Sequence, residues 1–343
     1  MVPNVLVYEI QPKDSLDSIA QKIGMSPSEL LDFHNAHCGE FGLLWMTGLA
    51  GIKKIVVPKN YKSVAEIRKA ITDALPTRNL SPEFFAAKYR ATESFVDFYR
   101  KKIEISFDID VDFPKNQKSS KESFSIIADA KNFKQNGVKP DGKMSELALA
   151  CIQTITPFAF EVSPRGKLLA INEFKNLEKT FVTKKEDLKD FFIGEISDKY
   201  ITLFENHLKD ETLFLQQYST NLLHQSLFPN PEWFYSQKLW EEKFYLVKNS
   251  FPVSMQLATT HQHLDEEIIQ TVIKGQSIDD AGLQDLLSGR KLGDVAAEPL
   301  NATLLLTYNT HKSTKQLLEL NAEVMLYAED EIFKEHHLHL IKS

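Results

Sequence analysis

The first 58 residues alternate between short apolar runs and segments whose apolar positions have helical spacing. Residues 5–10 and 53–58 are apolar runs of strand length, and the second ends at a proline. Between them, one run places Leu16, Ile19, Ala20 and Ile23 three and four positions apart, as on one face of a helix. A second run of this kind covers residues 26–35. The pattern therefore predicts the order strand, helix, helix, strand.

The ends of both predicted helices carry local signals. Asp14 is placed to accept hydrogen bonds from the free amides of the first helix, and Gly24 supplies the left-handed residue that ends it. Ser26 and Glu29 form the capping box of the second helix, with Pro27 at a position where its missing amide costs nothing. We therefore expect both helices to begin and end at defined residues.

This arrangement resembles the LysM family of small glycan-binding modules. The matching residues are Tyr8, Ile10, Asp14, Ser15 in place of threonine, Leu16, Ile19, Ala20, Leu30, Asn35 and Val57-Pro58. The resemblance covers residues 7–58. It implies two helices on one face of a two-stranded antiparallel sheet, and a shallow groove for N-acetylglucosamine-containing glycans such as peptidoglycan and chitin.

The implied groove lies between the loop after the first strand and the loop after the second helix. Its lining would be Gln11, Pro12, Lys13, Asp14 and Ser15 from one loop, and Asn35, Phe41, Leu43 and Trp45 from the other. Lys13 stands where the family usually has a glycine, which allows a sugar to approach the backbone closely. The second loop, residues 36–52, is longer than the family norm and apolar. It can stack on sugar rings, fold back onto a larger domain or dock another protein.

The rest of the chain predicts a connector over residues 59–82, with a short helix near 64–71, and then a larger domain over residues 83–343. Residues 103–113 alternate strictly between apolar and polar positions, as in a strand with one covered face. A hairpin follows over residues 158–171, whose turn contains Pro164 and Gly166.

Helical spacing runs from residue 172 to about 228, and we expect these helices to lie on a sheet face. A short helix is predicted near residues 279–287. Further strands are predicted at residues 240–247, 253–260, 268–273, 302–308, 316–327 and 332–341. Strands, then helices, then strands indicate an α+β fold with a mainly antiparallel sheet.

Composition narrows the class of partner. The chain has 343 residues and a net charge of −7, and this acidic excess argues against broad binding to nucleic acid or to anionic membranes. No apolar stretch approaches the ~20 residues that span a bilayer. Cys38 and Cys151 fall in different predicted domains, so no disulfide framework can be read and their pairing stays open.

The first residues lead directly into a strand and lack the apolar core of a secretory signal peptide. We therefore expect the protein to act in the cytoplasm, or to be assembled into or exported by a specialised apparatus. LysM modules also occur in leaderless proteins of phage tails and of contractile injection systems such as type VI secretion. The layout of this chain is similar to that class, by analogy.

Two groups of residues invite a metal hypothesis. Asp108, Asp110 and Asp112 have the spacing that begins a calcium loop, but Phe113 stands where that loop needs glycine, so a solvated strand face is favoured. The histidine pairs 261/263 and 337/339 each place two imidazoles on one strand face, and neither pair has an evident third ligand. We expect no metal and no cofactor, and the role of the histidine pairs stays open.

Motifs of catalysis are missing from the sequence, including a phosphate-binding glycine loop, a nucleophile elbow and a zinc-protease motif. The leading hypothesis is a non-catalytic adaptor that docks a protein partner and can also bind a peptidoglycan-type glycan. One alternative is a glycan-binding protein delivered to the cell wall. Another is a wall-active enzyme or secreted toxin whose catalytic site lies in the larger domain.

Overall fold

The computed structural model of the protein describes residues 5–45, 48–49, 51–59, 64–114, 123–236, 238–291, 298–329 and 331–343. It consists of two compact units, Met1–Ala74 and Leu75–Ser343. Each unit is considered by itself below. The helix α3 (Val64–Ala74), in the middle of the predicted connector, belongs to the first unit.

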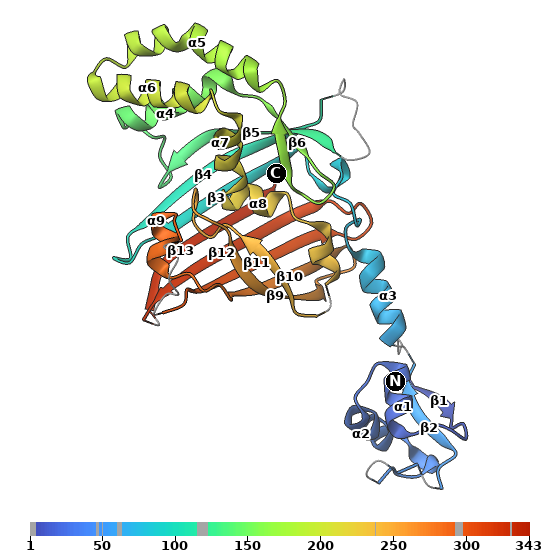
Figure 1. The fold of residues 1–343 in the computed structure, drawn as a ribbon. Coiled ribbons are helices and arrows are strands. Elements are labelled where there is room, and N and C mark those ends of the chain that lie inside the picture. Colours follow the sequence, from blue (N-terminus) through green and yellow to red (C-terminus); the bar gives the residue numbers. More distant parts are fainter. Residues whose placement is uncertain are drawn as a thin grey trace. The chain divides into compact units, whose positions relative to one another are not determined.

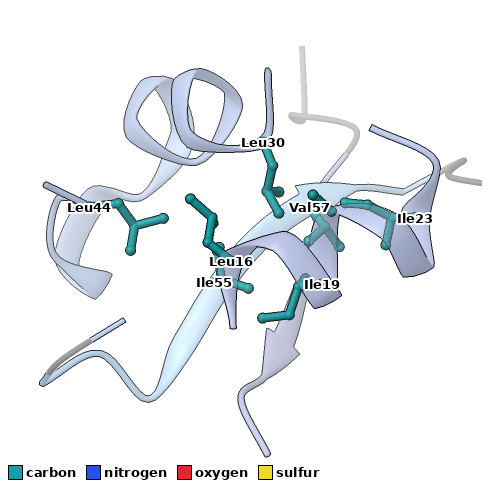
Figure 2. Packing of buried hydrophobic residues seen from close by; sticks show 8 residues of the cluster. Leu16, Ile19, Ile23, Leu30, Leu44, Ile55 and Val57 are labelled. Atoms are coloured by element: carbon teal, nitrogen blue, oxygen red, sulfur yellow. The ribbon is translucent and has the colours of Figure 1, made fainter. Parts of the chain in front are cut away.

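Within its described residues, the first unit contains two strands and two α-helices ahead of α3 (Figure 1). In chain order these are β1 (Val5–Glu9), α1 (Leu16–Ile23), α2 (Pro27–His37), the 3₁₀ turn η1 (Gly39–Phe41) and β2 (Lys54–Pro58). The two strands pair antiparallel, with Val5 opposite Pro58. Side chains of β2 and of the second loop meet one face of each helix in a buried cluster of Leu16, Ile19, Ala20, Ile23, Leu30, Leu44, Ile55 and Val57 (Figure 2). Tyr8 of β1 is partly buried against this cluster.

The predicted end of α1 and start of α2 are confirmed, the cap of α1 is corrected, and α2 continues to His37, two residues beyond its predicted end. Gly24 ends α1 in the left-handed conformation at φ 70°, and Ser26 with Glu29 forms the capping box of α2. The residue that caps α1 is Ser15 and not Asp14, because Ser15 Oγ accepts a hydrogen bond from the amide of Ser18 at 3.1 Å. The carboxylate of Asp14 is instead held by residues outside the helix start.

The second unit is built on one antiparallel sheet, which has eleven strands within the described residues. The spatial order is β7-β6-β5-β4-β3-β13-β12-β11-β10-β9-β8. The strands are β3 (Lys88–Val96), β4 (Lys102–Asp112), β5 (Phe124–Gln135), β6 (Ala159–Val162), β7 (Leu168–Ile171), β8 (Trp240–Phe244), β9 (Val253–His263), β10 (Ile268–Ser277), β11 (Asn301–His311), β12 (Leu317–Ala328) and β13 (Glu331–Lys342). The chain enters at the centre in β3, runs outward to β7, crosses to β8 and returns inward to β13.

The described helices of this unit lie over one face of the sheet or on the helices that cover that face (Figure 1). They are η2 (Pro82–Phe84), α4 (Lys143–Ile155), α5 (Phe174–Phe191), α6 (Glu195–His207), α7 (Glu211–Ser219), α8 (Leu222–Leu227), η3 (Pro231–Tyr235) and α9 (Leu283–Ser288). Alternate side chains of the strands are buried on the covered face, as Leu304, Leu306 and Tyr308 show in β11. The mixed helix and strand architecture with a large antiparallel sheet is therefore confirmed.

The expected placement of the long helices is wrong in part. We expected the apolar residues of α5 and α6 to face the sheet, but these helices pack on α4 and on each other, away from the sheet (Figure 1). Phe181 in α5 contacts Phe204 in α6, with 4.9 Å between ring centroids. Phe191 is consequently 77% exposed and Ile196 70% exposed, because only one side of each helix is covered.

Candidate functional site

The loop after β1 is organised around the carboxylate of Asp14. Lys22 Nζ donates to it at 2.6 Å, the Gln11 amide at 2.9 Å and the Tyr8 hydroxyl at 2.8 Å. These hydrogen bonds, led by that of Lys22, lower the pKa of Asp14 from 3.8 to about 2. The carboxylate is therefore ionised at neutral pH, and three donors of the protein already occupy it.

The other predicted residues of this loop divide into two kinds. The Ser15 hydroxyl is used as the cap of α1. Gln11, Pro12 and Lys13 are exposed, and the side chain of Gln11 donates to the carbonyl oxygen of Glu9 at 3.1 Å. Lys13 presents a charged side chain to solvent.

The second loop is fixed by two side chains of α2. Asn35 donates to the carbonyl oxygen of Leu44 at 3.0 Å and accepts from the Leu44 amide at 2.8 Å. His34, which is fully buried, accepts from the Val56 amide at Nδ1, and its Nε2 lies 2.8 Å from the Gly42 carbonyl oxygen. Asn35 therefore positions the loop backbone, and its side chain is not available to a ligand.

Leu44 brings the two loops to the same end of the unit. Its side chain is 2% exposed and lies in the buried cluster beside Leu16, the first residue of α1 (Figure 2). Its neighbours point outward, since Leu43 is 50% exposed and Trp45 is 79% exposed. Phe41 is half-buried. Residues 46, 47 and 50 of this loop lie outside the described residues.

We use the name "loop surface" for five of the exposed residues at this end, Gln11, Pro12, Lys13, Leu43 and Trp45. Of the other predicted site residues, Asp14, Ser15 and Asn35 serve the fold through internal hydrogen bonds. Lys22 and the His34 ring also have structural roles here, and neither was predicted from the sequence. Lys22 follows Asp14 by eight positions, a separation for which no local spacing rule predicts contact.

The aspartates of β4 confirm the solvated strand face. Asp110 lies 3.0 Å from Lys131 Nζ on the neighbouring strand and 3.7 Å from Lys88 Nζ. Asp108 lies 3.7 Å from the guanidinium of Arg90. These carboxylates alternate with apolar residues and pair with cations across the sheet.

The histidine pairs lie on opposite faces of the sheet. His261 contacts the carbonyl oxygen of Phe234 on the covered face, and burial lowers its pKa. His337, on the other face, lies 3.2 Å from Glu323 and 3.1 Å from Glu335. Among the residues that the structure describes, no group of three or more histidine, cysteine, aspartate or glutamate side chains is arranged to hold a metal ion.

The comparisons with known proteins add no identity. No model of a known protein family matches the sequence, and no curated protein matches it. In the described part of the chain, none of the helices has both the length and the apolar character needed to cross a bilayer.

Proposed function

We propose that the protein is a non-catalytic adaptor whose first unit is a LysM-type module that docks a protein partner through the loop surface. The observation that carries this proposal is that the polar and the apolar side chains of the two loops are used differently. The polar side chains of Asp14, Ser15 and Asn35 are occupied within the fold, while Leu43 and Trp45 project into solvent. The side chains left for a partner are apolar and aromatic in the second loop and include Lys13 in the first.

Such a surface suits protein docking. Tryptophan is among the residues that contribute most to protein interfaces, because its large ring buries much area and its N–H still finds a partner. Lys13 adds a charge at the rim, where it favours an acidic partner surface without having to be desolvated. The order of β1, α1, α2 and β2 supports the LysM part of the proposal.

A glycan ligand is the second candidate, and the exposure of Trp45 favours it. An indole ring with 79% of its surface exposed can stack on the apolar face of an N-acetylglucosamine ring. The cell-wall glycan would then bind across the loop surface. Lys13 argues against close approach of the sugar to the backbone on the other side.

The cellular setting is part of the same proposal. We infer that the adaptor acts in the cytoplasm or as a loaded component of a contractile injection apparatus. This inference rests on the similarity in layout, a LysM-type module joined to a larger domain, to LysM proteins of such systems. Genes for tail-sheath or spike proteins beside the gene of this protein would support it.

The test uses the full-length protein with a photo-crosslinking amino acid in place of Leu43. Expression in the native host should give one discrete protein adduct, and the identified partner is then purified. Trp45→Ala should weaken binding of this partner by about thirtyfold, as expected for an interface hot spot. Leu6→Ala, which changes an exposed leucine of β1, is the matched control and should leave binding unchanged.

Glycan binding is measured on the same variants by co-sedimentation with purified sacculi and by titration with chitin oligomers. Saturable glycan binding that is lost in Trp45→Ala would replace the docking proposal with the glycan proposal. If Trp45→Ala changes neither protein nor glycan binding, the loop surface is not the site.

A further inference from the structure

The covered face of the sheet contains a cavity of about 180 Å³ over its central strands. Its floor is formed by Glu93 and Phe95 of β3, Lys334 and His336 of β13, and two residues of β12. The segment that joins α7 to α8 and the segment after β8, residues 245–248, close it from above. The register places these floor residues together, because His336 lies opposite Phe95 on one side and opposite Val324 on the other.

Glu93 is the unusual residue of this cavity. It is only 8% exposed, and its Oε1 has no hydrogen-bond partner among the described residues. Its other oxygen lies 3.9 Å from His336 Nε2, which is too long for a hydrogen bond. His336 Nε2 is itself buried without a partner in the described part of the chain, and the ring stacks on Phe95.

A buried carboxylate that lacks hydrogen-bond donors destabilises the folded state. Burying a charged group is tolerated only where an opposite charge or several hydrogen bonds compensate for the lost water. Glu93 and His336 together therefore mark a place for a group that donates several hydrogen bonds and carries positive charge. An ammonium group has three N–H donors and fits both requirements.

Cations occupy another part of the lining. Lys334 is half-buried on the floor and Lys248 is exposed at the covering segment. Within the described residues neither lysine forms an ion pair. The cavity therefore presents a buried acid and, separately, two ammonium groups that are free to bind an anion.

The remaining lining is apolar and the space is small. Phe95, Leu222, Leu246, Val324 and Leu326 supply hydrophobic surface. A volume of about 180 Å³ is below the roughly 300 to 1,000 Å³ of sites that hold drug-sized molecules. The cavity fits a metabolite that combines an ammonium group, an anionic group and a short apolar part.

We propose that this cavity binds a small α-amino acid with an apolar side chain. The ammonium group donates to Glu93 Oε1 and to His336 Nε2. The carboxylate pairs with Lys248 and Lys334, and the side chain packs against Phe95 and the leucines above it. The site belongs to the second unit alone, so it is independent of the loop surface.

Isothermal titration calorimetry of the full-length protein tests the proposal. L-leucine is the first probe, with L-valine and L-phenylalanine to define the size limit. 4-Methylpentanoate lacks the ammonium group and 3-methylbutylamine lacks the carboxylate. We expect saturable binding of leucine, valine or phenylalanine with one site per chain, and no saturable binding of the two truncated probes.

Variants identify the groups responsible. Glu93→Gln keeps the size of the side chain and removes its charge, so it should weaken amino-acid binding by about tenfold or more. Lys248→Gln combined with Lys334→Gln should weaken binding by a similar factor, through the carboxylate. Lys274→Gln, at an exposed lysine of β10 outside the cavity, is the matched control. Thermal unfolding of each variant establishes that it is folded.

Three results would overturn the proposal. One is the lack of saturable binding for all three amino acids at millimolar concentration, measured with protein that unfolds cooperatively. Another is binding of 4-methylpentanoate or 3-methylbutylamine as tightly as leucine. The last is unchanged leucine binding in folded Glu93→Gln. Trp45→Ala should not alter leucine binding, so failure of the adaptor proposal leaves this one standing.

Discussion

The amide of Val56 donates a hydrogen bond to Nδ1 of His34, with 2.8 Å between the two nitrogens. The other ring nitrogen of His34 lies 2.8 Å from the carbonyl oxygen of Gly42. A ring that accepts at Nδ1 and donates at Nε2 is a single neutral tautomer. One imidazole therefore joins α2, the second loop and β2, and it supports the backbone that carries Leu43 and Trp45.

Replacing His34 by phenylalanine keeps a ring in the space but leaves the Val56 amide and the Gly42 carbonyl unpaired. We expect the first unit to lose about 1 to 3 kcal/mol of stability, the usual range for leaving a buried polar group without a partner. Hydrogen exchange of the full-length protein, followed by mass spectrometry, should show faster exchange in β2. His37→Phe changes an exposed histidine of the same helix and should exchange at the wild-type rate; equal protection in both variants would contradict the assigned role.

Gly166 and Gly137 give a matched pair of glycine tests in the second unit. Both are left-handed, at φ 77° and 83°, so alanine is strained at either position. A Cβ at Gly166 would also lie 2.2 Å from the Phe228 carbonyl oxygen, whereas no atom of the described residues would lie within 4 Å of one at Gly137. Gly137→Ala should cost about 1 kcal/mol, and Gly166→Ala should lower the thermal midpoint much further. Equal losses would show that the turn moves freely away from Phe228.

Acid should destabilise the second unit through His224. Its ring lies among Phe160, Tyr218 and Phe228, and burial, with a smaller effect from Lys248, lowers its pKa from 6.5 to about 3. The unfolded chain takes up the proton below about pH 6.5, while the folded chain does so only near pH 3. Stability is therefore full above pH 6.5 and is lost as the pH falls from there toward 3, at about 1.4 kcal/mol per pH unit.

His224→Phe should remove this part of the pH dependence. Urea unfolding at pH 7 and at pH 5 should show that the wild type loses about 2 kcal/mol more than the variant over that interval. His207→Phe, at an exposed position of α6, serves as the control and should follow the wild type. Equal losses of stability in the wild type and in His224→Phe would mean that the His224 ring binds a proton as readily in the folded state as in the unfolded state.

Cys151 should be inert in the folded protein. It is a free and fully buried thiol, and burial raises its pKa to about 11, so almost no thiolate is present at neutral pH. Reaction with a thiol reagent should be slow in buffer and immediate in urea. Cys38 is also a free, buried thiol, so comparison with Cys151→Ser is needed to show which part of the reaction belongs to Cys151. Rapid labelling of Cys151 without denaturant would indicate that α4 opens readily.

The sequence was most informative where structure is set by neighbours along the chain. The capping box at Ser26, the left-handed Gly24, the alternation in β4 and the turn at Gly166 all depend on contacts within a few residues, and all are confirmed. β3 was not predicted as a strand. Its covered face carries Ala91 and Glu93 between aromatic residues, so the alternation is weak.

Features that depend on distant contacts could not be read from the sequence. The pairing of Asp14 with Lys22, the order of the strands and the cavity around Glu93 all join residues without a local relationship. The strand β5 and the helix α4 were also missed, in the segment between two well-patterned regions. The candidate groove residues were found through the family resemblance, but the internal use of Asp14 and Asn35 needed the structure.

The pairing of β3 with β13 determines when the sheet of the second unit can be completed. β3 ends at Val96 and its central neighbour begins at Glu331, so a nascent chain exposes one open edge of β3 during most of its translation. Among the described pairs of neighbouring strands, β3 and β13 lie farthest apart in the sequence, and contacts of this kind form slowly. Removal of β13 would separate the described sheet into two groups of five strands, and β3 and β12 would each become an unprotected edge.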